Sequence, residues 1–281
     1  MSQKLDYKRW LNDNKDFLSQ FSGKKLFILF SGGKDCTLIL DYLLEAQKEF
    51  NFSCEVHAGR YPNHIFTDDE VKKLDSYWKG RNVNIHWHKI ADNDDEFTAA
   101  INKGINPCTV CHTNKREYMS NFIFSNYDDL KKLIIVVSFT LWDIVSYSLE
   151  NLLFNIFVDQ PDKNTNFFGS ANTIRDRYFQ TSQRFYPYMN IKNSFSIYRP
   201  FIRYNEQEIA EAIKEKNIPL STGTCLYKSS RPKRIFSDCY EKMDLSFDYE
   251  RVVSFSKTAL ELHDISDYND VNIKEYLANI F

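Results

Sequence analysis

A short polar turn in the first part of the chain has the residue types of a phosphate-binding site. It follows the apolar run of residues 27–30 and consists of Ser31, Gly32, Gly33, Lys34, Asp35 and Cys36. Paired glycines leave room for an anion to approach the backbone, whose successive N–H groups form an anion-binding nest. The apolar-rich residues 37–45 predict a helix, whose N-terminus adds partial positive charge beside the Lys34 ammonium. The pattern predicts a phosphate site made of a strand, a Gly-Gly-Lys turn and a helix.

This turn is not a Walker A loop, which places four residues between its first glycine and the Gly-Lys pair. The alternative is an ordinary helix start in which the glycines only relieve a tight turn. We favour the phosphate site, because it accounts for the strand, the glycines, the lysine and the helix together.

Two cysteines, Cys108 and Cys111, lie one helical turn apart just ahead of a predicted helix. This spacing lets both sulfurs face one centre, and a helix N-terminus favours thiolate over thiol. Four kinds of site compete: zinc, an iron–sulfur cluster, a redox dithiol and, since His112 completes a Cys-x-x-Cys-His string, haem attachment. The lack of an export signal disfavours haem, and the position far after the first strand disfavours a thioredoxin-like pair. For zinc, His112 and Cys225 are the additional candidate ligands.

The composition describes an ordered chain without a strong charge bias. Of 281 residues, 43% are hydrophobic and 16% aromatic, enough for one large domain or a domain with a helical appendage. The net charge is −2 and the pI about 6.3, whereas nucleic-acid binders commonly carry a basic surplus. Local basic groups at 175–177, at Arg199 with Arg203, and at 228–234 offset this in part.

No stretch reaches the length of a membrane span, and the polar N-terminus is not a signal peptide. We therefore expect a cytoplasmic protein with no membrane partner. In that reducing compartment the six cysteines serve as ligands, catalysts or core residues rather than as disulfides.

Strand patterns alternate with helical ones through the first half of the chain. After a helix at 5–20, strands are expected at 25–30, 53–58, 83–90 and 133–138, and helices at 34–49, 68–79, 113–124 and 143–157. Strands separated by helices imply right-handed crossovers and a doubly wound, mostly parallel α/β sheet. Ligands bind beyond the carboxyl ends of the strands in such sheets, which is where the Gly-Gly-Lys turn falls.

The second half is less regular. Residues 159–194 show no clear period and predict a long surface excursion, whereas 206–216 predict a short helix. The chain after residue 231 is predicted to be helical, with a break around 264–272. We divide the chain into an N-terminal helix (1–22), a core domain (23–225) and a helical C-terminal extension (226–281), which could supply a homodimer interface.

Residues 31–36 resemble the SGGKDS signature of the PP-loop ATP pyrophosphatases, with Cys36 in the usual serine position. The resemblance implies an adenine nucleotide alpha hydrolase-like fold in which these six residues hold the pyrophosphate half of ATP. Asp35 would assist magnesium, and the enzyme would cleave ATP to AMP and pyrophosphate. His57, which ends the second predicted strand, would contact adenine through its backbone.

Three further segments resemble the tRNA thiolases of this family, and among these the tRNA 2-thiocytidine synthases. Residues 107–111 match a P-C-x-x-C motif, residues 198–201 resemble an R-P-L segment, and residues 224–231 resemble a C-P-Y-S-type stretch. With the phosphate turn they follow the family order over residues 24–235. The resemblance implies a [4Fe-4S] cluster held by Cys108, Cys111 and Cys225, with one iron left open to carry sulfur.

One family motif is altered. Relatives carry G-H-x-x-D-D after the fourth strand, and this chain has Ser138, Phe139, Trp142 and Asp143 at the glycine, the histidine and the two acidic positions. Either the substrate is handled differently or the protein is partly degenerate. Trp142 could stack on a free nucleobase, or it could pack in the core.

Together these features predict an AMP-forming, ATP-dependent sulfurtransferase with ATP, Mg²⁺ and a [4Fe-4S] cluster as cofactors. The expected catalytic residues are Lys34, Asp35, Asp143, Cys108 and Cys111, and the expected substrate-binding residues are Trp142, Arg199, Arg231 and Arg234. We favour tRNA as the substrate over a free base, nucleoside or small amide, with sulfur supplied by a cysteine desulfurase or as free sulfide. The alternatives are an amide- or guanidine-forming ligase without a cluster and a non-catalytic nucleotide or cluster sensor.

Overall fold

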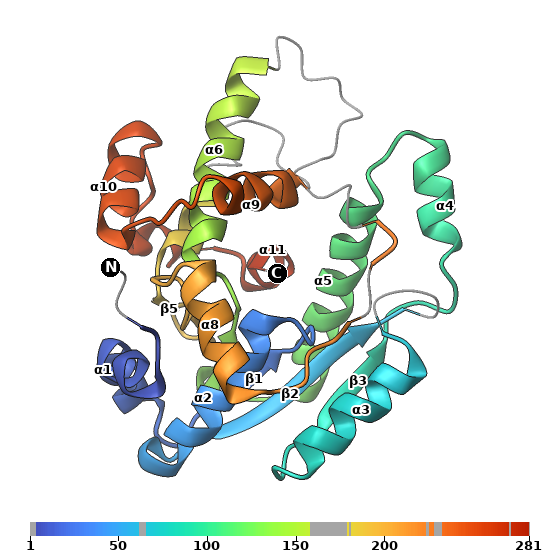
Figure 1. Ribbon diagram of the computed structural model, residues 1–281, viewed down its shortest axis with the longest axis vertical. Coiled ribbons are helices and arrows are strands. Elements are labelled where there is room, and N and C mark those ends of the chain that lie inside the picture. Colours follow the sequence, from blue (N-terminus) through green and yellow to red (C-terminus); the bar gives the residue numbers. More distant parts are fainter. Residues whose placement is uncertain are drawn as a thin grey trace.

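A six-stranded sheet forms the centre of the protein in the computed structural model, which describes residues 4–61, 66–157, 179, 181–222, 225–227, 232–269 and 271–280. The strands are β1 (Lys25–Leu29), β2 (Ser53–Arg60), β3 (Ile85–Lys89), β4 (Leu133–Val136), β5 (Tyr188–Asn190) and β6 (Ser196–Tyr198). Their order is β3-β2-β1-β4-β6-β5, and only the β5–β6 pair is antiparallel (Figure 1). The structure confirms the predicted mostly parallel, doubly wound α/β fold.

Side chains that alternate along the strands divide the core between the two faces of the sheet. Leu26 and Ile28 belong to one cluster, with residues of α1 (Tyr7–Leu18), α2 (Lys34–Phe50), α3 (Asp68–Lys79) and α8 (Glu206–Lys216). Phe27 between them belongs to the other cluster, with residues of α5 (Pro107–Asn126) and α11 (Ile273–Ile280). Helices therefore cover both faces, as Figure 1 shows.

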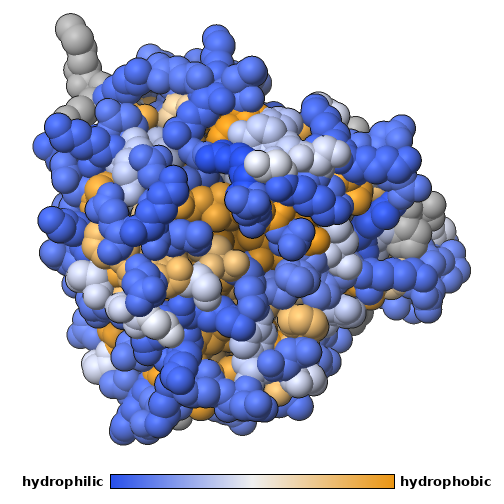
Figure 2. Space-filling view, turned by 90° about the horizontal axis from the view of Figure 1, so that it is seen from below, coloured by the Kyte–Doolittle hydropathy of each residue, from blue (hydrophilic) through white to orange (hydrophobic). Residues whose placement is uncertain are grey.

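The remaining helices extend the molecule beyond the sheet. They are α4 (Asp95–Asn102), α6 (Leu141–Phe157), α9 (Pro232–Lys242) and α10 (Tyr249–Ala259). Figure 1 shows α6, α9 and α10 above the sheet on one side, facing α4 and the upper end of α5. The view from below has a mostly hydrophilic surface with a central strip of hydrophobic residues (Figure 2). Among the described residues, no helix combines the length and apolar character that a membrane span requires.

Two helices differ from the prediction. The helix expected at 113–124 begins earlier, at Pro107, because the Asn106 side chain caps it by accepting from the Cys108 N–H and proline suits its first position. The two cysteines therefore lie inside the helix, as its second and fifth residues, and not ahead of it. The helix α4 lies in a stretch for which the sequence analysis expected no helix, and the acidic side chains in its first turn, Asp95 and Glu96, stabilise its N-terminus.

The stretch 159–194 was expected to be a long surface excursion, but its described part contains regular structure. Residues 158–178 and 180 lie outside the described residues, but 181–194 contain a 3₁₀ turn at Gln183–Phe185 and the edge strand β5. β5 and β6 escaped the sequence analysis because strands of three residues give no measurable period.

The helices expected after residue 231 are present as α9, α10 and α11. α9 ends at Lys242 and α10 begins at Tyr249, and the stretch between Ala259 and Ile273 includes the break expected around 264–272. Tyr276 and Leu277 of α11 belong to the same cluster as Phe27, so this helix packs on the core.

Candidate active site

The Gly-Gly-Lys turn lies at the carboxyl end of β1, where it joins α2. Gly32 has a φ of +68°, in the left-handed region that favours glycine. The chain also passes very close, because the Ser221 N–H donates to the Gly32 carbonyl at 2.8 Å. A Cβ atom on Gly32 would lie 2.8 Å from the Ser221 Cβ, closer than carbon atoms approach. Both the backbone angle and the space therefore require glycine.

The backbone after the turn has the geometry of an anion site. Gly33 is the N-cap residue of α2 and supplies no side-chain cap, and its carbonyl accepts from the Thr37 N–H at 3.1 Å. The first N–H groups of a helix have no acceptors within the helix, and the helix dipole adds partial positive charge there. An incoming phosphate can therefore take the place that a capping side chain would occupy.

Cys36 holds the turn from within α2. Its sulfur accepts from the Ser31 N–H at 3.2 Å and lies 3.3 Å from the Ser31 hydroxyl, and the thiol donates to the Gly33 carbonyl at 3.3 Å. The side chain is 1% exposed, and burial raises the pKa of the thiol. The predicted ATP-binding role of Cys36 is therefore best understood as support of the turn by a neutral thiol.

Lys34 and two carboxylates form the charged part of the site. The Lys34 ammonium donates to the Glu206 carboxylate at 2.9 Å and lies 3.3 Å from Asp35 Oδ1. Burial opposes the charged ammonium, but the two carboxylates outweigh it and raise the pKa of Lys34. Burial, together with the nearby charge of Asp35, raises the pKa of Glu206 despite the attraction of Lys34. Glu206, the first residue of α8, was not found by the sequence analysis, because a single acidic residue at a helix start is common on its own.

Arg234 of α9 is close enough to this group to favour the ionised form of Glu206. Its own guanidinium pairs with Asp238 at 2.9 Å on the same helix. The predicted Arg234 thus lies within electrostatic range of Glu206. Arg231, the other basic residue predicted on this segment, lies outside the described residues.

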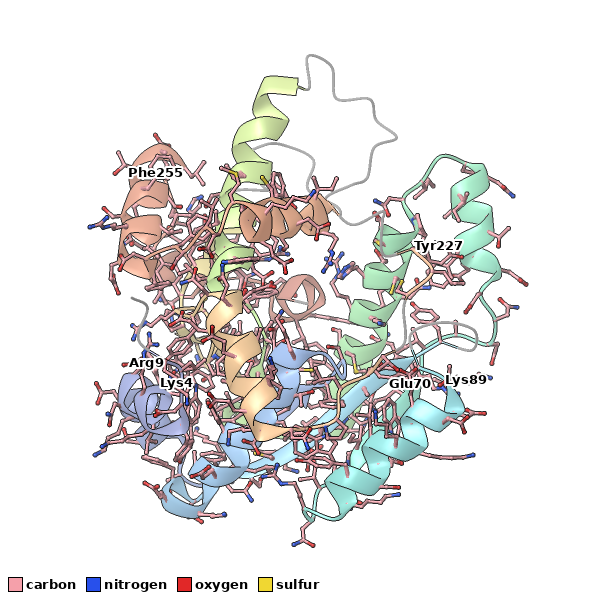
Figure 3. The ribbon with its side chains drawn as sticks, viewed as in Figure 1. Lys4, Arg9, Glu70, Lys89, Tyr227 and Phe255 are labelled. Atoms are coloured by element: carbon pink, nitrogen blue, oxygen red, sulfur yellow. The ribbon has the colours of Figure 1, made fainter. Side chains whose placement is uncertain are left out.

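Residues 221 and 222 connect the turn to α3. The hydroxyls of Ser221 and Thr222 donate to Oε1 of Glu70 at 3.1 and 3.2 Å. Glu70 also belongs to the capping box that begins α3, and Figure 3 labels it on that helix. Ser221 and Thr222, which are distant in sequence from the Gly-Gly-Lys turn, therefore link this turn to α3.

The two cysteines of the Cys-x-x-Cys motif lie near the segment that carries the third. The Cys108 thiol donates to the Tyr227 carbonyl at 3.7 Å, and Tyr227 is two residues after Cys225. The Tyr227 ring is 5.5 Å from Phe97 of α4, and Figure 3 shows Tyr227 between α4 and α5. The structure thus places residues 225–227 against the N-terminus of α5.

The three thiols suit a cluster in type and neighbourhood but are not gathered at one point. Among the described residues, no group of three or more His, Cys, Asp or Glu side chains is placed to hold a metal ion. Tyr61 adds a neighbour that the sequence analysis missed: its hydroxyl donates to the Cys111 carbonyl at 3.3 Å. Burial, followed by the charge of Cys111, raises the pKa of Tyr61, so this hydroxyl stays a donor beside the cysteines.

The two residues at the acidic positions of the altered motif, Trp142 and Asp143, are buried near the start of α6. Asp143 is 1% exposed, and its Oδ2 accepts from the N–H and the hydroxyl of Thr140 at 2.8 and 3.3 Å. It caps the helix, and its predicted catalytic role stays a prediction. Trp142 is 3% exposed and meets Tyr240 edge-on at 5.3 Å. The ring therefore has the core position that was the alternative to base stacking.

Arg199 and His57 are also interior residues. Arg199 is 0% exposed and donates through Nη1 to the Tyr186 carbonyl at 2.9 Å. His57 does not end its strand, since β2 continues to Arg60, and its carbonyl accepts from the Phe30 N–H at 2.8 Å. Its ring stacks on Phe27 and lies 2.9 Å from the His88 ring nitrogen. Burial, and then the neighbouring His86 and His88, lower the pKa of His57 to about 3.

A solved structure resembles the fold of this chain, whereas no sequence comparison finds a match. No protein-family model matches the chain, and no curated protein matches its sequence. Among solved structures, the U34-tRNA thiolase NcsA from Methanococcus maripaludis, with its [4Fe-4S] cluster, is similar with a TM-score of 0.58 and 14% identity. The match covers 96% of this chain and 88% of that one.

Two synthetases give weaker matches. The NMN synthetase from Francisella tularensis has a TM-score of 0.44 at 11% identity, over 97% of this chain and 92% of that one. The NAD⁺ synthetase from Burkholderia pseudomallei has a TM-score of 0.44 at 12% identity, over 95% and 91%. At these TM-scores neither structure establishes a shared fold. The strand order, the Gly-Gly-Lys turn and the likeness to the thiolase show that the chain has the PP-loop fold.

Proposed function

We propose that this protein is an ATP-dependent, AMP-forming sulfurtransferase that converts a nucleobase carbonyl into a thiocarbonyl. One juxtaposition carries the proposal: the phosphate turn with Lys34, and the Cys108 thiol in contact with the Cys225–Tyr227 segment, occur in one PP-loop fold. The first part suits ATP and the second suits sulfur.

The nucleotide half follows from the turn. The N–H groups after Gly33, the Ser31 hydroxyl and the Lys34 ammonium are the donors for the pyrophosphate part of ATP. Asp35 and Glu206 already share the Lys34 ammonium, so both carboxylates are within reach of one cation. Magnesium binds through one or two carboxylates plus substrate phosphates, and these two residues would hold it. Bound there, Mg²⁺ would neutralise charge on the leaving pyrophosphate.

The reaction proceeds in two displacements. The carbonyl oxygen of the base attacks the α-phosphorus, the bond to the bridging oxygen breaks, and pyrophosphate leaves. Fixed backbone donors and Lys34 stabilise the charge that develops on that leaving group. A sulfide then attacks the activated carbon, the bond to the original oxygen breaks, and AMP leaves with that oxygen.

The sulfur half depends on the cysteines. Cys108, Cys111 and Cys225 would hold a [4Fe-4S] cluster, whose fourth iron supplies an open position for sulfide. Closing such a site requires residues 225–227 to bring the Cys225 thiol to the first turn of α5. Cysteine binds metal in its thiolate form.

A tRNA substrate has the support of the likeness to the tRNA thiolase, whereas the net charge of −2 supports a small base or amide. The test is anaerobic purification, iron and sulfide analysis, and ATP turnover with sulfide and either tRNA or free bases. We expect AMP, pyrophosphate and a product in which oxygen has been replaced by sulfur, detected by mass.

Each other outcome excludes part of the proposal. AMP and pyrophosphate without iron or sulfur exchange would indicate an amide- or guanidine-forming ligase. ATP binding without turnover would indicate a sensor. Release of ADP and phosphate would contradict the pyrophosphatase chemistry altogether.

A further inference from the structure

Two arginines from separate parts of the chain, Arg184 and Arg199, lie near the same Phe139 ring after the end of β4, and Arg116 of α5 lies within electrostatic range of Arg184. Arg116 comes from α5, Arg184 from the 3₁₀ turn Gln183–Phe185, and Arg199 follows β6. Arg184 is the middle member, because its charge acts on both of the others. Phe139 lies between two of them, with its ring centre 5.8 Å from the Arg184 Cζ and 6.0 Å from the Arg199 Cζ.

Two of the three guanidinium groups, those of Arg184 and Arg199, have buried N–H donors without a hydrogen-bond partner. Arg199 donates from Nη1 to the Tyr186 carbonyl, but its Nε and Nη2 are inaccessible to solvent and have no hydrogen-bond partner. The Nε of Arg184 is in the same state. A buried donor without an acceptor costs free energy comparable to a lost hydrogen bond, and more for a charged group. Such donors are available to an acceptor that enters the cluster.

In the described part of the chain, the positive charges of these arginines also lack ion-paired carboxylates to balance them. Among the residues that the structure describes, no carboxylate forms an ion pair with Arg116, Arg184 or Arg199. The acidic group in range is Glu150 of α6, and burial raises its pKa to about 7 although Arg184 favours its ionised form. Burial, and then the neighbouring Arg184 charge, lower the pKa of Arg116 and that of Arg199.

The other groups that face the cluster are aromatic. Tyr147 of α6 lies with its ring centre 4.5 Å from the Arg184 Cζ, and Tyr249 and Tyr276 are the remaining titratable neighbours of Arg199. Tyrosines are neutral near pH 7, so they offer ring faces to the cations but no negative charge. Phe139 adds an uncharged ring to the cluster and no fourth cation.

We propose that Arg116, Arg184 and Arg199 form a binding site for a phosphate group of the substrate, separate from the phosphate turn. Arginine forks suit the oxygens of phosphate, and three of them together match a group with one or two negative charges. β6 and β4 are neighbours and β4 adjoins β1, so Arg199 and Phe139 lie at the same sheet edge as the turn. The site itself stands on the arginines; only the assignment of the phosphate to the substrate rests on the proposed function.

The phosphate could belong to a polynucleotide or to a free nucleotide, and titration calorimetry of the full chain separates these sources. Inorganic phosphate and a single-stranded RNA oligonucleotide are titrated at constant ionic strength. The proteins are the wild type, Arg184→Gln, Arg116→Gln and, as a matched control, Arg251→Gln, which changes an exposed arginine on α10. Lys34→Ala removes the lysine of the phosphate turn, so that binding there does not confuse the result.

We expect saturable binding by the wild type and by the Lys34→Ala and Arg251→Gln variants, and about tenfold or more weaker binding by Arg184→Gln and Arg116→Gln. Binding of RNA but not phosphate with this pattern would assign the site to a polynucleotide, and the reverse pattern to a free phosphate or nucleotide. Binding that survives both arginine changes, or that Lys34→Ala alone abolishes, would overturn the proposal. So would the absence of binding by the wild type. AMP and pyrophosphate release by the wild type would still report separately on the proposed function.

Discussion

The Lys34 ammonium donates to the Glu206 carboxylate at 2.9 Å, which joins the phosphate turn to the start of a helix 172 residues later in the chain. Under the proposed function, a phosphate oxygen of ATP would compete with the Glu206 carboxylate for this ammonium. A displaced carboxylate would then be available to a cation beside Asp35.

The variant Glu206→Gln separates the competition with ATP for Lys34 from the binding of magnesium. The change removes the competing charge from Lys34, so ATP without magnesium should bind several-fold more tightly. It also removes a magnesium-binding carboxylate, so turnover of Mg-ATP should fall about tenfold or more. Equilibrium binding and pyrophosphate release measure the two effects. Glu211→Gln, at an exposed position of the same helix, should change neither. Parallel changes of the same sign in both assays would exclude the double role.

Gly32→Ala should destabilise the fold and abolish nucleotide turnover. An alanine at φ +68° costs about 1–2 kcal/mol, and its Cβ must also displace Ser221. Gly23→Ala is a matched control, because Gly23 has a φ of +71° but open space around the added carbon. Urea unfolding should show a loss for both and a larger one for Gly32→Ala. Only Gly32→Ala should lose pyrophosphate release; equal activities would show that the close approach is not needed.

The cysteine assignment can be tested by metal analysis. Cys108→Ser, Cys111→Ser and Cys225→Ser should each lower the iron and sulfide content of anaerobically purified protein by more than half and abolish sulfur exchange. Cys239→Ser, at an exposed position on α9, should keep the full content. Retention of iron by Cys225→Ser would exclude the third ligand, and zinc in place of iron in the wild type would exclude the cluster.

Stability should fall in mild acid because of the buried His57 ring. The pKa of His57 is lowered to about 3 in the folded protein, whereas an unfolded histidine titrates near its ordinary value of about 6.5. Between these two pH values the unfolded chain binds the additional proton, so stability declines as pH falls through that window and is regained above it. From pH 7.5 to pH 5 the loss should be about 1–2 kcal/mol by urea unfolding. His57→Asn should show a shallower decline; an unchanged slope would assign the effect to other groups.

The alternation of strands and helices was sufficient to predict the α/β class, because a buried parallel strand is apolar and its covering helix amphipathic. Short elements were not predictable in this way. Three residues of β6 give no period, yet β6 pairs with β4 and places Arg199 at the carboxyl edge of the sheet. The start of α5 was missed for another reason. Thr109 and Val110 are weak helix formers, and the stabilising cap at Asn106 outweighs their low propensity.

The sequence by itself determined the phosphate turn and the cysteine pair. Glycines at a strand end, a lysine at a helix start and a one-turn cysteine spacing are local features, fixed by backbone geometry over a few residues. Only the tertiary structure decided which distant residues join them. It brought Glu206 to Lys34, Tyr227 to Cys108 and Arg184 to Arg199, and it buried Trp142 and Asp143. Such neighbours depend on the order of strands in the sheet and on the packing of helices against it, and neither is encoded in the spacing of nearby residues.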